Sequence, residues 1–386
     1  MKVWPKELLQ WFWKVKRDLP WRKTKDPYAI WVSEIMLQQT QVKTVIPYYL
    51  AFLERFPSVR SLAKAELEEV LESWRGLGYY TRARHLWEGA RFIMENEEGK
   101  FPESYKSLLK IPGVGEYTAG AIASIAFKER VPAIDGNVNR VLARMLAWEE
   151  PTGKVKSRRA FHDLILDDQP KDYPGDFNQA LMELGATLCT PKIVKCEECP
   201  LNMACEAHEL GRELAYPVKQ GQQRVTEALR LTLILRRGDQ FAIKKRPSEG
   251  LLANLWEFPG KEIVQNDIMT KKEQSWPAAV AEPAEDSHHV VMNAQVWYEI
   301  YQRVVKDRSQ DKEVRDMLEQ QLKVKGPIYH VFSHRRWEMY WVVIQCPKEM
   351  PHQEDIRWVT YQELEKIAFP VAFQKVLEEV KSEIIS

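Results

Sequence analysis

The chain has 386 residues, and its 56 Lys and Arg residues almost balance 55 Asp and Glu residues. A net charge of +1 gives no global signal for nucleic-acid binding, so any phosphate-binding surface must be a local patch. Five cysteines are too few for a disulfide scaffold, and without a signal region or a membrane span we expect a cytoplasmic protein of two or three domains.

Residues 1–218 are predicted to form a helical half. Apolar residues recur at the 3.6-residue spacing of helices, and strand-like alternation is rare. The clearest helical runs cover residues 30–48, 62–71, 82–94 and 138–147. Residues 219–226 (KQGQQRVT) are polar, which is typical of a linker.

Glu34 interrupts an otherwise apolar helical run. Burying a carboxylate is costly unless it has a partner or a function, and burial would raise its pKa and suit it to be a general acid. The alternative is an exposed glutamate on a helix surface. The following glutamines, among them Gln39, would by themselves indicate only a polar helix face.

A glycine-rich turn lies in the segment LKIPGVGEYTA, residues 109–119. One helix is expected to end near Leu109 and a second to begin near Glu116. Gly113 and Gly115 would let backbone amides approach a ligand, and amides at a helix N-terminus favour an anion. A helix–hairpin–helix of this kind can grip a DNA phosphate without net basic charge, but an ordinary pair of antiparallel helices is the alternative.

Asp135 follows the apolar run VPAI and precedes a predicted helix. This is a common position for an N-cap, whose side chain accepts a hydrogen bond from the first turn. The sequence around Asp135 leaves both a capping role and a catalytic role open.

Four of the five cysteines follow the pattern C-x6-C-x2-C-x5-C. They are Cys189, Cys196, Cys199 and Cys205. Thiolates gathered this closely indicate a metal–sulfur site, and both iron–sulfur clusters and structural zinc use four cysteines. The wide outer arms favour a [4Fe–4S] cluster, with zinc and two disulfides as alternatives. Cys346 lies apart in a strand-like run and is expected to be a buried free thiol.

The second half, residues 227–386, has an α+β pattern. Two strand pairs are predicted, 228–236 with 240–245 and 328–333 with 337–345. Residues 262–312 are polar and poorly periodic, so much of this segment is expected to be a loop or insertion.

The hairpin, Asp135 and the cysteine loop, in this order, resemble the helix–hairpin–helix DNA glycosylase superfamily with an iron–sulfur loop. The resemblance implies a multidomain chain that begins with an all-α glycosylase region over residues 1–218. A six-helix barrel would cover about 23–128, and an iron–sulfur subdomain would combine 1–22 with 129–218. Asp135 would then be the catalytic carboxylate.

Residue 117 distinguishes the branches of this superfamily. Bifunctional members have a lysine there, which attacks the sugar as a Schiff-base nucleophile. This chain has Tyr117, so water is the expected nucleophile. The segments LPWR (19–22) and WVSEIMLQQTQV (31–42) are similar to the adenine DNA glycosylase (MutY) family, which implies that Glu34 protonates the leaving base.

The same resemblance assigns further contacts. Gln39 would wedge into the DNA stack, as would Tyr79 from a G-Y-Y-x-R motif. Tyr117 and Asn137 would orient the two carboxylates and the sugar. Gly113 and Gly115 would bind a phosphate, and Arg22 and Gln179 would contact the adenine edge. Asn139 stands where some members have a lysine, which would alter DNA retention.

The segments GLLANLWEFP (250–259) and FSHRRW (332–337) are similar to the Nudix-like C-terminal domain of that family. The resemblance implies that Phe332, Ser333 and His334 contact 8-oxoguanine. The glutamate helix that a Nudix hydrolase needs for Mg²⁺ is degraded at residues 315–320, so this domain is expected to read the lesion and not to be a second enzyme.

The expected protein is a monofunctional glycosylase with a [4Fe–4S] cluster. It would act as a monomer, at the bacterial nucleoid and without membrane partners, on double-stranded DNA containing adenine opposite 8-oxoguanine or G. A bifunctional pyrimidine glycosylase/lyase is one alternative, which Tyr117 disfavours. A catalytically silent damage binder is another, which Glu34 and Asp135 disfavour.

Overall fold

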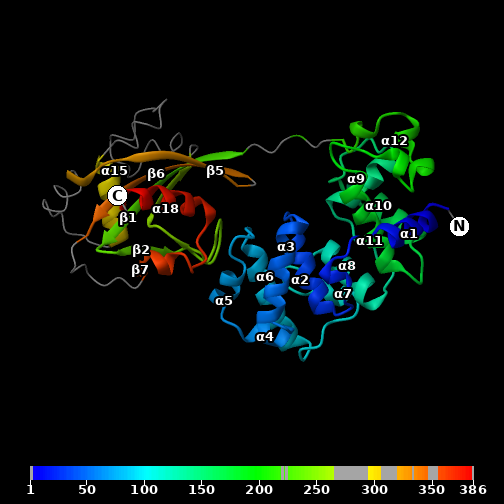
Figure 1. Cartoon of the computed structure of the whole chain (residues 1–386), viewed down its shortest axis with the longest axis horizontal. Helices are drawn as coiled ribbons and strands as arrows, with labels where there is room; N and C mark the ends of the chain where they lie inside the picture. The colour runs from blue at the N-terminus through cyan, green and yellow to red at the C-terminus, as the bar shows by residue number, and fades with distance from the viewer. Residues whose placement is uncertain are drawn as a thin grey trace. The chain divides into compact units, whose positions relative to one another are not determined.

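Figure 1 shows the computed structural model of the chain. It describes residues 3–218, 221, 225–264, 294–305, 320–332, 334–346 and 355–384. The chain forms two compact units, Met1–Gly221 and Gln222–Ser386. Their boundary falls within residues 219–226, most of which lie outside the described residues.

The first unit is built from helices and short 3₁₀ turns. The helices are α1 (Trp4–Val15), α2 (Pro27–Leu37), α3 (Val42–Arg55), α4 (Val59–Lys64), α5 (Leu67–Ser73), α6 (Thr81–Asn96), α7 (Tyr105–Leu108), α8 (Glu116–Phe127), α9 (Gly136–Met145), α10 (Val155–Asp168), α11 (Pro174–Thr187) and α12 (Glu206–Glu209). The turns are η1 (Pro20–Arg22), η2 (Cys196–Glu198), η3 (Asn202–Ala204) and η4 (Glu213–Ala215). In the described parts of the chain, no helix combines the length and the apolar character needed to cross a bilayer.

Helix α2 lies inside the first unit. Every residue from Tyr28 to Met36 is buried, and the helix packs on α3, α6 and α8. A helix that is apolar on all sides must be surrounded in this way. Its start is fixed by Pro27 and by Asp26, whose side chain accepts a hydrogen bond from the backbone amide of Tyr28. This arrangement carries Glu34 into the interior.

Two predicted helical runs are broken in the structure. Residues 30–48 contain the end of α2 and the start of α3, and Gln39 between them has a φ of 57°. Residues 62–71 are divided between α4 and α5. The apolar spacing continues across both breaks because the paired helices face the same core, so periodicity alone did not reveal the turns.

A second helical core brings the two ends of this unit together. Helix α1 packs on α11, where the rings of Trp4 and Phe177 lie 5.3 Å apart. Helices α9 and α10 contribute to the same cluster, and Cys189 and Cys199 pack against it. The cysteine loop therefore packs against the same core as α9, the helix that begins just after Asp135.

The second unit contains one mixed sheet. Its described strands are β1 (Thr226–Arg237), β2 (Gln240–Lys245), β3 (Trp256–Glu257), β4 (Gly260–Val264), β5 (Lys325–Val331), β6 (Arg335–Gln345) and β7 (Ile356–Thr360). They run in the order β3-β2-β1-β6-β5, with β4 paired to β1 and β7 to β2. Both predicted antiparallel pairs, β1 with β2 and β5 with β6, are confirmed, and β1 and β6 join them in parallel.

Helices cover both faces of this sheet (Figure 1). The helices of this unit are α15 (Ala294–Val305), α17 (Tyr361–Leu364) and α18 (Val371–Ile384). Leu229 and Leu231 of β1 join a core with α15, whereas Ala228 and Ile234 join a core with α18. Strand β1 is buried along most of its length for this reason.

Helix α15 corrects part of the prediction for residues 262–312. Residues 262–264 belong to β4, and residues 294–305 form α15, which buries Trp297 and Tyr301 in the core. Residues 265–293 and 306–312 lie outside the described residues. The polar residues around α15 hid a helix whose apolar side chains follow the 3.6-residue spacing.

Candidate active site

A polar cavity of about 840 Å³ opens in the first unit. It gathers side chains from α2, α8, α9 and α11. Among the predicted residues that line it are Arg22, Glu34, Gln39, Tyr117, Asp135, Asn137 and Gln179. Segments far apart in the sequence therefore supply one site.

Glu34 is buried in this cavity, with only 6% of its surface exposed. Its Oε2 accepts a hydrogen bond from the hydroxyl of Tyr117, the second residue of α8. Burial raises the pKa of Glu34 to about 7, and nearby Asp135 adds to this, while Tyr117 and Arg22 oppose it. Glu34 can therefore hold a proton near neutral pH and release it to a ligand.

Asp135 is the N-cap of α9 and also lines the cavity. Its Oδ1 accepts a hydrogen bond from the amide of Val138 at 2.7 Å, and its Oδ2 accepts one from Asn137 Nδ2 at 2.8 Å. Burial raises the pKa of Asp135, while these two donors and Arg140 favour its ionised form. The two readings of Asp135 are compatible, because one carboxylate caps the helix and faces the cavity.

Arg17 and Glu183 also line the cavity, although no motif in the sequence marks them. Glu183 is 1% exposed, and it accepts hydrogen bonds from Arg17 Nε at 2.7 Å and from Arg22 Nη2 at 2.8 Å. Burial alone would raise the pKa of Glu183, but the two guanidinium groups lower it to about 2. Glu183 is thus ionised and fixes Arg22 at the cavity wall.

Gln39 and Tyr79 are both exposed. Each has a left-handed backbone, with φ of 57° for Gln39 and 49° for Tyr79, which is uncommon for residues with a Cβ atom. Gln39 lies at the cavity, and Tyr79 lies in the turn just before α6. Both side chains can be reached by a partner outside the protein.

The glycine-rich turn joins α7 to α8. Gly113 has a φ of 76°, and a Cβ atom there would lie 2.4 Å from the Cβ of His85, so glycine is required on both counts. Gly115 caps α8 and opens to free space. The predicted helix–hairpin–helix is therefore present, with an open α8 N-terminus whose first turn carries Tyr117.

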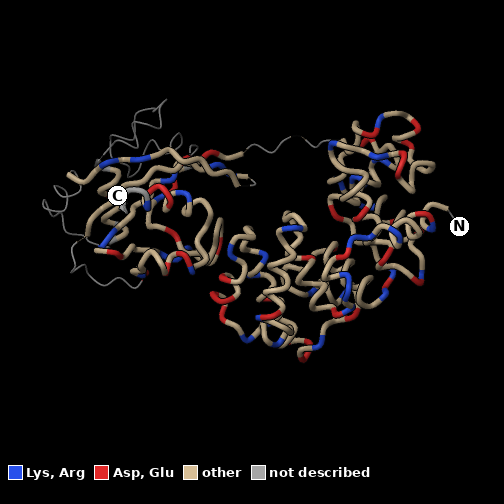
Figure 2. The backbone as a smooth tube through the Cα atoms, in the orientation of Figure 1, with Lys and Arg blue, Asp and Glu red and all other residues tan. Residues whose placement is uncertain are grey.

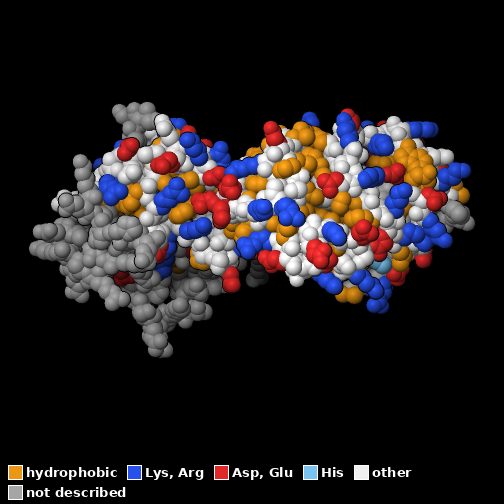
Figure 3. Space-filling view, turned by 90° about the horizontal axis from the view of Figure 1, so that it is seen from below, with side chains coloured by type: hydrophobic (Ala, Val, Ile, Leu, Met, Phe, Trp, Pro, Cys, Tyr) orange, Lys and Arg blue, Asp and Glu red, His pale blue; other side chains and the backbone are white. Residues whose placement is uncertain are grey.

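Charges of both signs are mixed along both units (Figure 2). The face drawn in Figure 3 likewise has Lys and Arg side chains dispersed among acidic and hydrophobic ones. A phosphate contact on such a surface depends on local donors, such as the backbone amides of the hairpin.

The four clustered cysteines, all of which the structure describes, line one small cavity as free thiols. Burial raises the pKa of the Cys196 thiol to about 12, and Glu213 and then the neighbouring thiols add to this. Burial raises the pKa of Cys199 to about 11, and Cys189 and Cys205 add to it. Arg144 Nη1 lies 3.2 Å from the sulfur of Cys189. The disulfide alternative is not met, and four convergent sulfur donors fit a metal–sulfur centre.

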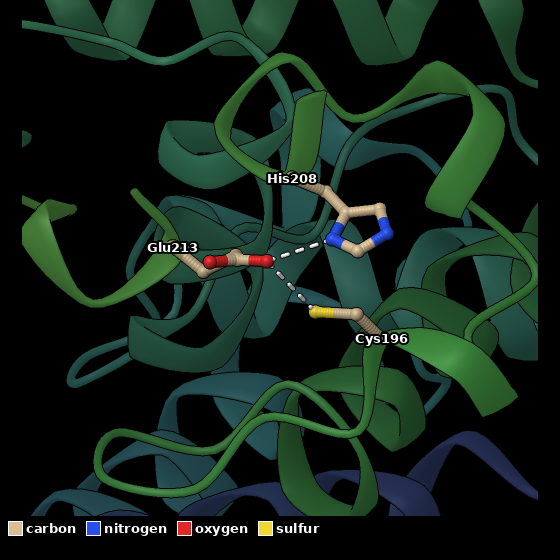
Figure 4. Close-up of side chains that lie close together, drawn as sticks. All are labelled: Cys196, His208 and Glu213. Carbon is tan, nitrogen blue, oxygen red and sulfur yellow. Dashed lines mark hydrogen bonds and ion pairs between the residues drawn. The ribbon is translucent and has the colours of Figure 1, made fainter. Parts of the chain in front are cut away.

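His208 and Glu213 lie beside one of these sulfurs (Figure 4). Glu213 Oε1 is 2.7 Å from His208 Nδ1 and accepts a hydrogen bond from the Cys196 thiol at 3.4 Å. These three groups could themselves hold a metal ion. Because Cys196 belongs to both ligand sets, the three-residue set competes with the four-cysteine set.

The cysteine loop is connected to the polar cavity through Arg140. Arg140 Nε donates to the carbonyl oxygen of Cys189 at 2.9 Å, and its Nη2 donates to Asn137 Oδ1 at 2.9 Å. Asn137 in turn donates to Asp135. Two hydrogen-bonding side chains thus separate the cysteine loop from the Asp135 carboxylate.

Two of the predicted lesion-reading residues, Phe332 and His334, lie between β5 and β6. The ring centroids of Phe332 and Trp337 lie 4.9 Å apart. The backbone amide of Phe332 donates a hydrogen bond to the carbonyl oxygen of Arg335 at 2.7 Å. His334 is exposed. Ser333 lies outside the described residues, as do residues 315–319 of the degraded Nudix helix.

Each of the two units is similar to a known protein family. Residues 32–165 match the model of the HhH-GPD superfamily base excision DNA repair protein, and residues 231–379 match the NUDIX domain. Adenine DNA glycosylase of Rattus norvegicus is 34% identical over 96% of this chain and 76% of its own length. The adenine DNA glycosylase of Arabidopsis thaliana is 43% identical over 65% of this chain. This chain spans about half of that relative's length, 46%. A solved thermostable thymine-DNA glycosylase is 30% identical with a TM-score of 0.50, covering 54% of this chain and 96% of its own.

Proposed function

Because the chain belongs to the adenine DNA glycosylase family, we propose that its substrate is adenine paired with 8-oxoguanine or G in double-stranded DNA. The protein is a DNA glycosylase, and the proposed reaction is hydrolysis of the N-glycosidic bond of that adenine without strand cleavage. One observation carries this proposal. A protonatable Glu34 and the carboxylate of Asp135 share one cavity. Residue 117 of the same cavity, where bifunctional members have a lysine, is a tyrosine.

The reaction begins with base flipping, since the bond to be broken is inaccessible inside a duplex. Gln39 and Tyr79 are exposed and shaped to enter the stack when the adenine leaves it. Arg22, fixed by Glu183, and Gln179 on α11 line the cavity that would take the base and can contact its edge. The hairpin glycines leave the α8 amides open to a phosphate.

Glu34 would then donate its proton to N7 of the adenine, so that the base departs neutral. The sugar acquires oxocarbenium character as the C1′–N9 bond breaks. The carboxylate of Asp135 stabilises this cation, as one of the two carboxylates does in glycoside hydrolysis. Tyr117 and Asn137 hold the two carboxylates through their hydrogen bonds. Water then adds to C1′, because residue 117 offers no amine, and gives up a proton to Glu34, which the first step left ionised.

The second unit would recognise the opposite base. Between β5 and β6, His334 is exposed and the ring of Phe332 packs against Trp337. Contacts from Phe332, Ser333 and His334 to 8-oxoguanine would favour the lesion over G. Chromosomal DNA as substrate would place a monomer of this protein at the nucleoid of a bacterial cell.

Cys189, Cys196, Cys199 and Cys205 would hold a [4Fe–4S] cluster, which supplies a structural anchor for its loop. The surrounding loop carries Lys192 and Lys195, whose charges can face a DNA phosphate. Arg144, close to the sulfur of Cys189, would offset part of the negative charge of thiolates that hold a cluster.

The proposal is tested on three duplexes that contain A opposite 8-oxoguanine, A opposite G, or thymine glycol. Free adenine should be released from the first two, and the strand should break only after alkali. Release of thymine glycol without adenine would instead assign the chain to the pyrimidine-specific branch.

The absence of an amine at residue 117 predicts little covalent trapping. Borohydride should capture almost no protein–DNA adduct, and Tyr117→Lys should increase trapping by restoring an amine near C1′. The measurement is the fraction of labelled DNA that migrates with the protein on a denaturing gel. Efficient trapping by the unmodified protein would contradict hydrolysis by water.

The cysteine cavity predicts iron in the isolated protein. Anaerobic purification should yield about four iron atoms per chain and the broad visible absorption of thiolate–iron charge transfer. Cys199→Ser should lose iron and colour together, measured by metal analysis and absorbance. Stoichiometric zinc in place of iron would instead favour the alternative that the sequence left open.

A further inference from the structure

Arg82 occupies a position that its own helix does not favour. It is the second residue of α6, where the positive end of the helix dipole repels a cation, and it is 8% exposed. Burial lowers its pKa to about 10, so it remains charged at neutral pH. A buried charge in such a place must be compensated by its neighbours.

Backbone carbonyl groups provide most of that compensation. Arg82 Nη1 donates to the carbonyl oxygens of Ile35 at 3.0 Å, of Met36 at 2.9 Å and of Gln38. These lie at the C-terminus of α2, where carbonyl groups lack helical partners and the helix dipole is negative. The guanidinium group therefore fixes the last turn of α2 just before Gln39.

The other arm of the same group reaches the second turn. Arg82 Nη2 donates to Gly78 O at 3.1 Å, to Leu77 O at 3.2 Å and to Thr40 Oγ1 at 3.1 Å. Its central carbon lies 5.5 Å from the ring centroid of Tyr79. One side chain thus bonds on both sides of Gln39 and also holds the backbone and ring of the Tyr79 turn.

We propose that Arg82 is a positioning residue that fixes Gln39 and Tyr79 as one rigid pair for opening the DNA stack. The left-handed conformations of both residues are unfavourable and persist only where the surroundings impose them. Arg82 imposes both, so the two wedges enter the duplex already oriented relative to one another. This inference rests on the proposed function, because it assigns a base-opening role to Gln39 and Tyr79.

A lysine cannot replace this arginine. The four N–H groups of Nη1 and Nη2 share six acceptors from two turns, whereas an ammonium group has three donors at a single point. Arg82→Lys therefore keeps the charge and removes the two-armed geometry. Arg91→Lys is the matched control, because Arg91 lies on the same helix, is exposed and pairs with Glu95.

The test compares excision from two substrates that differ in the free energy needed to unstack the target adenine. One is an intact duplex with A opposite 8-oxoguanine, and in the other flanking mismatches have already unstacked the adenine. Arg82→Lys should slow single-turnover excision roughly 10- to 100-fold on the intact duplex, since unstacking costs a few kcal/mol, and far less on the opened one. A 2-aminopurine beside the target should show a weaker fluorescence rise, and Arg91→Lys should change neither readout.

A second arm asks whether Arg82 acts through the wedges. In a chain that carries Gln39→Ala and Tyr79→Ala, Arg82→Lys should cause little additional loss on the intact duplex. Equal loss on both substrates, or full additivity with the wedge substitutions, would reduce Arg82 to a general structural role and overturn the proposal. If the unmodified protein excises adenine from neither substrate, the proposed function itself fails, which is a separate result.

Discussion

Glu34→Gln is expected to abolish excision and at the same time to stabilise the protein above neutral pH. The loss follows from the removal of the proton that Glu34 offers to the leaving base, and general acids contribute about 10²- to 10⁴-fold to the rate. A glutamine side chain at this position keeps the shape of the glutamate and an oxygen that can accept from Tyr117. Single-turnover excision and duplex binding, measured together, should show a loss of the first with the second nearly intact.

The gain in stability has its origin in burial. The pKa of Glu34 rises from 4.5 in a solvated chain to about 7 in the folded protein, so the folded state loses stability between these values as pH rises. At pH 8 this cost is about 3 kcal/mol, which an uncharged glutamine does not incur. Urea unfolding at pH 8 should therefore give a higher midpoint for Glu34→Gln, and at pH 4 the two proteins should be close.

The same ionisation sets the pH dependence of catalysis. Excision by the unmodified protein should decline as pH rises through about 7, because Glu34 must be protonated to act. A rate that increases steadily from pH 6 to pH 9 would mean that Glu34 acts as an ionised base. An unchanged midpoint at pH 8 for the glutamine variant would mean that Glu34 is solvated in the folded protein.

The burial of Glu34 could be predicted because the neighbouring residues in the sequence are almost all apolar. Glu34 stands within apolar residues on all sides of a helix, and a charge there needs an explanation. Glu183 is buried as deeply, but the helix α11 around it contains several polar residues and gives no such contrast. Its partners, Arg17 and Arg22, are more than 160 residues away in sequence, and only the fold brings them together.

The contacts of Arg82 could not be predicted from the sequence either. Most of its partners are backbone carbonyl groups, which have no side-chain signature. Those of Ile35, Met36 and Gln38 become available only because α2 ends at Leu37. The predicted continuous helix over residues 30–48 would have satisfied those carbonyl groups internally. By contrast, α15 did have a signal in its apolar spacing, which the polar residues on either side obscured.

Substitutions of Asp135 can separate its structural role as an N-cap from its proposed role in catalysis. The carboxylate caps α9 through the amide of Val138, and asparagine is as good an N-cap as aspartate. Asp135→Asn should therefore keep the unfolding free energy within about 1 kcal/mol of the parent, allowing for an impaired hydrogen bond to Asn137.

Excision should nevertheless fall by about 10³-fold or more, because asparagine carries no charge to stabilise the oxocarbenium ion. Asp135→Ala removes the cap as well, so it should lose the same activity together with about 1–2 kcal/mol of stability. Single-turnover rates and urea unfolding of the two variants decide the matter. An asparagine variant that excises adenine at the parental rate would leave Asp135 with the capping role alone, and the anion opposite the sugar would have to be another carboxylate of the cavity. Among the described residues that line it, Glu183 is the remaining candidate, but both of its oxygens already accept from Arg17 or Arg22, so its charge is largely neutralised.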